Sequence, residues 1–151
     1  MRVLCSMILA GAILVALIPS SAVADLGVGV IAGEPTGFSF KWWNEGGTAV
    51  DSAIGWSLGD DRFYVHCDYL WPHTVKAESV IGGAPLYYGV GVQVVLSEDS
   101  DATIGVRLPV GLDYMFDNRR VDIFVEIAPI LTVIPEGDFD VSGGVGVRFY
   151  F

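Results

Sequence analysis

Residues 139 to 151 alternate between two kinds of side chain, and this alternation constrains the fold more than any other feature of the chain. One parity holds aromatic and aliphatic residues, interrupted by Gly143, and the other holds small, polar or charged residues. The apolar set is Phe139, Val141, Val145, Val147, Phe149 and Phe151, and the opposite set is Asp140, Ser142, Gly144, Gly146, Arg148 and Tyr150. Successive side chains of a β-strand point to opposite faces, so the pattern predicts a strand with one apolar and one polar face.

The same alternation recurs along the chain between turn residues, and helical periodicity is absent. We expect strands at 26–33, 38–43, 48–58, 62–71, 86–96, 102–116, 121–133 and 139–151. Pro109 and Pro129 fall inside two of these and are interpreted as bulges or local kinks, because proline cannot donate a ladder hydrogen bond. The pattern predicts an all-β fold, an eight-stranded antiparallel up-and-down transmembrane β-barrel. Its first and last strands must pair, because lipid cannot satisfy an open sheet edge.

The N-terminal segment has the features of a secretory signal peptide. Arg2 supplies a positive charge, residues 3–18 are mostly apolar, and the small residues at 22–24 match a cleavage site. We therefore expect residues 1–24 to be a signal peptide and residues 25–151 to be the barrel. Beyond residue 24 no apolar run is long enough for a transmembrane helix, although the chain is 52% hydrophobic. Cys67 is the only cysteine after this point, so no disulfide framework is expected.

Several segments also resemble a known group of proteins. They are "GVGVIAGEPTGFSFKWW", "AVDSAIGWS", "VHCDYLW", "LYYGVGVQ", "RLPVGLDYMF", "VEIAPILTVIP" and "GGVGVRFYF". Together they resemble a family of small outer-membrane β-barrel proteins, largely of unknown function. The resemblance implies an eight-stranded barrel in the outer membrane of a Gram-negative-type bacterium and brings no catalytic residue with it. The aromatic ending, Phe149 and Phe151, resembles the signal that the barrel assembly machinery reads.

If the apolar parity faces lipid, the other parity carries charged side chains into the lumen. The expected lumen charge network is Lys41, Asp51, His66, Asp68, Arg107, Glu126 and Arg148, and Asp113 and Asp122 share the same parity. An eight-stranded barrel is only wide enough for side chains to fill, and enclosed charges must pair. We expect Arg107, Glu126 and Arg148 to form a bridge. The network is interpreted as a structural plug, with a gated ion or proton path as the alternative.

Neither a catalytic site nor a cofactor or metal site is expected from the sequence. A lipid-modifying outer-membrane enzyme would need a histidine near a hydroxyl or an acid, for which His66, His73, Asp68, Ser57 and Thr74 are the available residues. Nothing in their spacing marks an activated nucleophile. The "GVGV" repeats lie within alternating strands and no helix follows them, so they are not phosphate loops.

Acidic residues concentrate in the loops at one end of the expected barrel. These loops carry Glu34, Asp60, Asp61, Glu98, Asp99, Asp101, Glu136 and Asp138. They suit solvation, and they could also collect divalent cations that bridge to lipopolysaccharide phosphates. Nucleic acid is excluded as a partner, because the net charge is −10 and no basic patch exists.

The sequence therefore predicts an integral outer-membrane β-barrel protein with a mainly structural or interaction role and a side-chain-filled polar lumen. Its expected partners are outer-membrane lipid and lipopolysaccharide, the barrel assembly machinery, and divalent cations at the acidic loops. Two alternatives remain. A soluble periplasmic ligand-binding barrel would turn its aromatic residues inward and its charges outward, and a narrow, porin-like ion or solute pore would have a conducting lumen.

Overall fold

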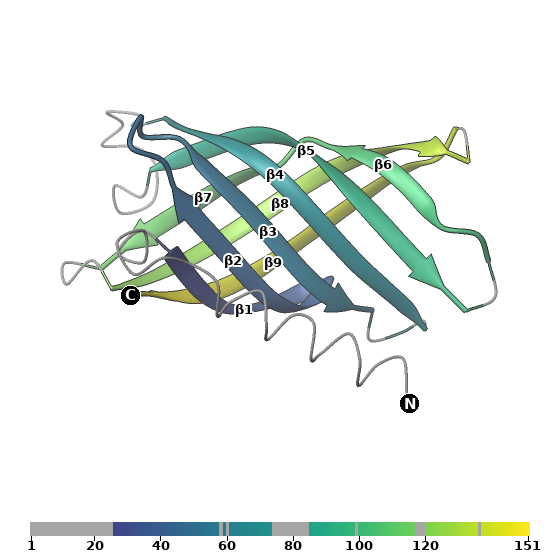
Figure 1. Ribbon diagram of the computed structural model, residues 1–151, viewed down its shortest axis with the longest axis horizontal. Helices are drawn as coiled ribbons and strands as arrows, with labels where there is room; N and C mark the ends of the chain where they lie inside the picture. The colour runs from purple at the N-terminus through teal and green to yellow at the C-terminus, as the bar shows by residue number, and fades with distance from the viewer. Residues whose placement is uncertain are drawn as a thin grey trace.

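The computed structural model describes residues 26–57, 59, 61–73, 85–98, 100–116, 120–135 and 137–151. Within these residues it consists of strands and their connections, without a helix (Figure 1). The strands are β1 (Leu26–Glu34), β2 (Thr36–Trp43), β3 (Ala49–Trp56), β4 (Arg62–His73), β5 (Leu86–Ser97), β6 (Thr103–Arg107), β7 (Val110–Met115), β8 (Val121–Ile134) and β9 (Phe139–Tyr150). The expected signal peptide at 1–24 lies outside the described residues, as do residues 74–84, which belong to the connection between the expected strands 62–71 and 86–96.

All nine strands belong to one antiparallel sheet that closes into a ring. Consecutive strands pair from β1 to β5, β6 and β7 lie end to end between β5 and β8, and β9 pairs with both β8 and β1. The expected pairing of the first and last strands is confirmed, with Val30 opposite Val147. Each described strand thus has a neighbour on both sides, and none lies at a sheet edge.

The expected count of eight strands is wrong, because the sixth expected strand is divided in two. Residues Leu108 and Pro109 separate β6 from β7, and Pro129 lies beside them in β8, which is continuous. The Leu108 amide donates to the Pro129 carbonyl at 2.9 Å, and the Gly89 amide donates to the Pro109 carbonyl at 2.9 Å. Two prolines therefore remove ladder donors at one place in the ring, which is why the regular ladder stops there.

The connection between β1 and β2 is tighter than the four residues, 34–37, that separate the expected strands 26–33 and 38–43. β1 extends to Glu34 and β2 begins at Thr36, so only Pro35 lies between them. The Thr36 hydroxyl holds this corner by accepting from the Gly33 amide at 3.1 Å and donating to the Gly33 carbonyl at 2.9 Å. Gly33 has a φ of 149°, a conformation that residues with a Cβ rarely adopt.

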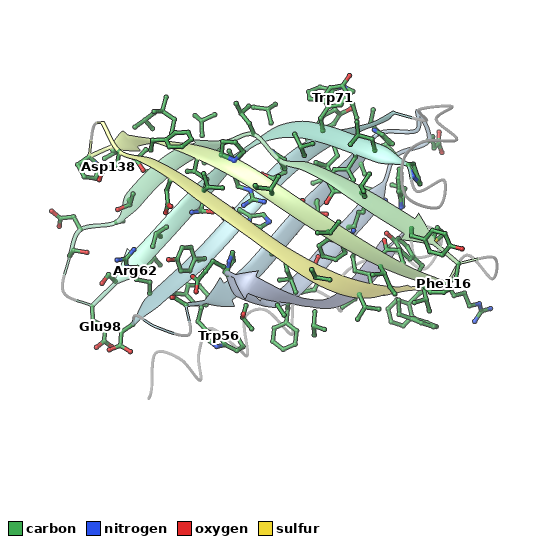
Figure 2. The ribbon with its side chains drawn as sticks, turned by 180° about the vertical axis from the view of Figure 1, so that it is seen from behind. Trp56, Arg62, Trp71, Glu98, Phe116 and Asp138 are labelled. Atoms are coloured by element: carbon green, nitrogen blue, oxygen red, sulfur yellow. The ribbon has the colours of Figure 1, made fainter. Side chains whose placement is uncertain are left out.

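The two ends of the ring differ in character. The loops after β1, β3, β5 and β8 lie at one end, which we call the acidic rim; its described and exposed acids are Glu34, Asp61, Glu98, Asp101, Asp138 and Asp140. The connections after β2, β4 and β7 lie at the other end, together with Leu26 and Phe151, and we call it the terminal rim. Figure 2 shows Glu98 and Asp138 at one end and Trp71 and Phe116 at the other.

Alternation along each strand separates an exposed apolar face from a buried inner face. In β8 the buried residues include Asp122, Phe124, Glu126 and Ala128, and the exposed ones between them are Ile123, Val125 and Ile127. Glycines on the inner parity leave room for large neighbours: a Cβ built on Gly27 would lie 2.6 Å from the Tyr150 ring, and one on Gly146 would lie 2.3 Å from the Phe124 ring. At these positions the interior is therefore filled by the neighbouring aromatic side chains.

Candidate functional site

Arg107 is the centre of one group of polar side chains inside the ring. It lies on β6, is 1% exposed, and its Nε donates to both carboxylate oxygens of Asp68, at 2.9 and 3.2 Å. Its Nη1 donates to the Ser142 hydroxyl at 2.7 Å, and its Nη2 donates to Glu126 Oε1. The Tyr87 hydroxyl donates to the other oxygen of Glu126 at 2.8 Å. We call these five residues the Arg107 cluster; it joins β4, β5, β6, β8 and β9.

Arg148 is the centre of a second group, nearer the terminal rim. From β9, its Nη1 donates to Asp51 at 2.5 Å and its Nε donates to Asp122 at 3.2 Å. The Tyr150 hydroxyl donates to Asp122 at 2.6 Å, and the guanidinium carbon lies 3.9 Å from the centre of the Phe124 ring. We call this the Arg148 cluster. Its guanidinium is both ion-paired and stacked, which suits the planar, delocalised charge of arginine.

Lys41 connects the two clusters. Its ammonium group donates to Asp113, and Asp113 Oδ2 also lies 3.6 Å from Arg148 Nη2. The same ammonium lies 4.5 Å from the centre of the Trp43 ring and 5.0 Å from that of Tyr87, a member of the Arg107 cluster. Cations over aromatic faces are stabilised by the ring quadrupole. The buried charges therefore form one connected network along the interior.

The structure buries every residue that the sequence analysis assigned to the lumen network. Those residues are Lys41, Asp51, His66, Asp68, Arg107, Glu126 and Arg148. Arg107 and Glu126 are in contact, whereas Arg148 does not form an ion pair with Glu126 in this structure and contacts Asp51, Asp113 and Asp122 instead. The expected three-residue bridge is thus divided between two clusters.

Sequence reasoning left out several members of these clusters. Asp113 and Asp122 were placed on the inner parity but not in the network, and the hydroxyl groups of Tyr87, Ser142 and Tyr150 were not considered. All five occupy the inner parity of their strands, so this pattern could have identified them. Their choice of partner depends on strand register, which the alternation alone does not specify.

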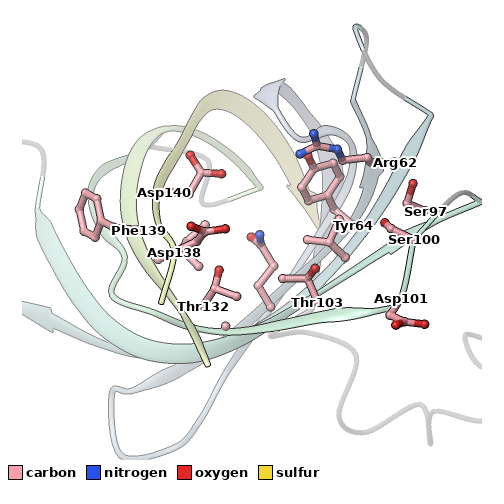
Figure 3. A pocket seen from close by; sticks show the side chains of 14 residues that line it. Arg62, Tyr64, Ser97, Ser100, Asp101, Thr103, Thr132, Asp138, Phe139 and Asp140 are labelled. Carbon is pink, nitrogen blue, oxygen red and sulfur yellow. The ribbon is translucent and has the colours of Figure 1, made fainter. Parts of the chain in front are cut away.

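A cavity of about 440 Å³ opens at the acidic rim (Figure 3). Its lining is mostly polar, with carboxylates and hydroxyls near the mouth; the labelled side chains include Tyr64, Asp101, Thr103, Thr132 and Asp140. Gln93 also lines it and is only 4% exposed. The cavity therefore extends from the rim toward the inner residues of β5.

One group of possible metal ligands lies inside the ring. His66, Asp68 and Glu126 are all buried, and each offers a ligand atom within 4.8 Å of the others. The residues available to a lipid-modifying enzyme do not converge in the same way. The Ser57 hydroxyl lies at the acidic rim and donates to Glu34 at 3.3 Å. His66 lies opposite Ala53 in the β3–β4 ladder, further from this rim. Thr74 lies outside the described residues.

The outer face of the ring carries a continuous apolar surface. Aliphatic side chains are exposed around its middle, including Val92, Val106, Val110, Val125, Ile127 and Val145. Exposed aromatic residues gather toward the terminal rim: Trp42, Tyr69, Trp71, Tyr88, Tyr114, Phe116, Phe149 and Phe151. Fewer lie toward the acidic rim, where Phe38, Trp56 and Phe139 are exposed. Soluble monomers rarely expose a contiguous apolar area of this extent.

The geometry described above is the basis on which a function can be proposed for this chain. Among the described residues there is no helix long and apolar enough to cross a membrane. The chain matches no family model, no curated protein and no solved structure.

Proposed function

We propose that this protein is an integral outer-membrane β-barrel with a mainly structural or interaction role and an interior closed by side chains. The observation that supports this most is the inverted polarity of the closed sheet. Arg107, Arg148 and Lys41 are each 1% exposed inside the ring, whereas Ile127 and Val145 are more than half exposed outside it. A soluble protein arranges its side chains in the opposite way.

The strand pairing supports the same proposal. In a bilayer every backbone polar group must find its partner within the protein, so β-structure spans a membrane only when the sheet is closed. Here β1 pairs with β9, and no described strand lies at an edge. The exposed aliphatic band with aromatic residues toward both ends also corresponds to the surface of outer-membrane barrels.

A charge on the outer face provides the sharpest test of this location. Val125 lies on β8 within the exposed aliphatic band and is 47% exposed. In a membrane barrel, Val125→Arg should cost about 2–4 kcal/mol and lower the amount recovered from the membrane fraction. In a soluble protein the same exposed substitution would be harmless. Glu98→Arg at the acidic rim is the matched control and should fractionate as the unmodified protein does.

The measurement is cell fractionation with a carbonate wash, together with the mobility of heated and unheated samples on a gel. We expect the unmodified protein in the washed membranes and a mobility that changes on heating. Recovery of the unmodified protein and of Val125→Arg in the soluble periplasm would overturn the proposal. It would favour the soluble ligand-binding alternative, although that alternative calls for charged residues outside the ring, whereas Arg107 and Arg148 lie inside it.

The interior favours a plug over a narrow pore. Arg107 contacts residues from β4, β8 and β9, so its side chain spans the interior on the inner side of the cavity. Protein reconstituted into a planar bilayer should therefore give no current steps. Reproducible steps whose frequency rises with the amount of protein would replace the plug with the pore alternative.

The proposed partners follow from the two rims. Phe149 and Phe151 are exposed at the terminal rim with ring centres 5.4 Å apart, so both are accessible to the barrel assembly machinery. At the acidic rim, exposed carboxylates suit Ca²⁺ or Mg²⁺ that bridges to lipopolysaccharide phosphates. Calcium should raise the melting temperature in detergent that contains lipopolysaccharide. If calcium raises the melting temperature of the double variant Asp101→Asn and Asp138→Asn by the same amount, the acidic rim is not the site at which calcium acts.

A further inference from the structure

Three buried side chains converge inside the ring in a way that the structural role does not require. His66 and Asp68 lie on β4 and Glu126 lies on β8, and one ligand atom from each lies within 4.8 Å of the other two. Ligands of a single zinc ion lie about 3–3.5 Å from one another, because each bond to the metal is about 2.0–2.2 Å long. A contraction of about 1.3–1.8 Å at the widest pair would therefore bring all three ligand atoms into one coordination sphere.

The charge balance of the interior favours a bound cation. Among the described residues, the buried carboxylates are Asp51, Asp68, Asp113, Asp122 and Glu126, and the buried cations are Lys41, Arg107 and Arg148. Five carboxylates face three cations, which leaves an excess of two negative charges. Uncompensated charge inside a protein is costly. A cation bound inside the ring would offset part of this excess.

Two buried polar atoms beside this group have no hydrogen-bond partner. His66 is 3% exposed, its Nδ1 has no hydrogen-bond partner, and its Nε2 lies 3.7 Å from Asp68 Oδ2. Gln93 lies directly opposite His66 in the β4–β5 ladder, and its buried Oε1 also lacks a partner. Because Gln93 lines the cavity at the acidic rim, this cavity extends to the ladder neighbour of His66.

The neighbouring groups suit a coordination sphere rather than block it. Metal-binding carboxylates are usually hydrogen-bonded to other protein groups, which orient them. Glu126 accepts from Tyr87 at 2.8 Å and from Arg107, and Asp68 accepts from Arg107 at 2.9 Å. Each carboxylate oxygen has two lone pairs, so these bonds leave positions for a metal. Arg107 offsets only one of the two carboxylate charges, so the group still attracts a cation.

From this geometry we propose that His66, Asp68 and Glu126 bind one divalent transition-metal ion of the zinc type. An imidazole ligand favours Zn²⁺, Co²⁺ or Ni²⁺ over Ca²⁺ and Mg²⁺, which prefer oxygen ligands alone. The ion would join β4 to β8 across the interior. This inference goes beyond the proposed membrane role and does not depend on it.

The test is calorimetric titration of Zn²⁺ into the purified, EDTA-treated protein in detergent, with excess Ca²⁺ present to occupy exposed carboxylates. We expect saturable binding of one Zn²⁺ per chain. His66→Gln should weaken it at least about 10-fold, because loss of a ligand costs no less than loss of a supporting group. His73→Gln is the matched control: it changes the chain's other histidine, the last residue of β4, and should leave the affinity unchanged. Cys67→Ser should also bind normally, which separates this site from the exposed thiol.

A spectroscopic measurement keeps the proposal testable if His66→Gln does not fold. The zinc X-ray absorption spectrum of the unmodified protein should show nitrogen and oxygen ligands, including imidazole, and no sulfur. Absence of saturable Zn²⁺ binding, equal affinity in a folded His66→Gln protein, or sulfur ligation would each overturn the proposal. Titration and fractionation are separate experiments, so loss of the metal site and loss of the membrane assignment would be distinguished.

Discussion

Arg107 shows how a single residue can decide the stability of this interior. Its guanidinium contacts Asp68, Glu126 and Ser142, and both carboxylates are almost fully buried. A buried ion pair contributes little net stability compared with an apolar replacement of both partners, because the charges lose their hydration. Removal of one partner is far more costly, since the remaining charge has neither water nor a counterion.

Arg107→Met should therefore lower the free energy of unfolding by about 3–5 kcal/mol. Denaturant unfolding in detergent or vesicles, followed by tryptophan fluorescence, measures the change. Addition of Asp68→Asn and Glu126→Gln to the same protein should restore part of the loss, because it removes the unpaired charges. Arg62→Met, at the exposed end of β4, should change stability by less than about 1 kcal/mol. Equal effects of Arg107→Met and Arg62→Met would contradict the central position of Arg107.

Gly111 provides a second test at the residue scale, this time of packing. A Cβ at this position would lie 2.4 Å from the Tyr87 ring and 2.5 Å from the backbone oxygen of Val125. Because the backbone cannot move independently of its ladder, Gly111→Ala should destabilise the protein by about 1–3 kcal/mol. Gly46→Ala is the control, since a Cβ there meets nothing within 4 Å. The two variants can be compared by the same unfolding measurement, and equal stability would argue against the inward position of Tyr87.

At the scale of strands, alternation in the sequence located nearly every element but not the break between β6 and β7. Pro109 and Pro129 were recognised as ladder defects, yet they lie 20 positions apart in the chain. Only the pairing of β6 and β7 with β8 brings the two prolines side by side. Two backbone N–H donors are then absent at the same point of the ladder, and the strand is interrupted there. The same limit applies inside the ring: parity predicts that Arg148 points inward, but strand register determines that it meets Asp51 rather than Glu126.

The last strand permits a test that separates assembly from stability. Phe151 follows β9, is 61% exposed, and donates only one weak backbone hydrogen bond, to Leu26 at 3.3 Å. Phe151→Ala should thus change the unfolding free energy by about 0.5 kcal/mol or less, as exposed substitutions usually do. If the assembly machinery reads this residue, the amount of protein in the membrane should nevertheless fall severalfold, as immunoblots of fractionated cells would show. Phe116→Ala, an exposed aromatic at the same rim but after β7, should leave this amount unchanged. Equal losses from both variants would assign the effect to the aromatic surface instead.

At the scale of the whole molecule, one pairing determines whether the sheet is a ring or an open surface. The strands β1 and β9 come from opposite ends of the described chain, and their contact separates the polar interior from the apolar exterior. Without it, the Arg148 cluster would lose the wall formed by β1, and two strand edges would be open. Closure is therefore a requirement for the buried charges as well as for the apolar outer face.

Paired cysteines can test this closure and its register. Val30 lies opposite Val147, and residues directly opposite in an antiparallel ladder have Cα atoms about 4.5–5.5 Å apart, within the range for a disulfide. In a protein that lacks Cys5 and Cys67, Val30→Cys with Val147→Cys should therefore form a disulfide under mild oxidation. The matched pair Val30→Cys with Val145→Cys should not, because Val145 lies opposite Ala32 and the diagonal spacing is about 7–8 Å. Non-reducing gels of heated samples, with mass spectrometry of the crosslinked peptide, distinguish the two. Crosslinking of the shifted pair alone would place β9 two residues away from its register here, and crosslinking of neither pair would mean that the ring is open between β1 and β9.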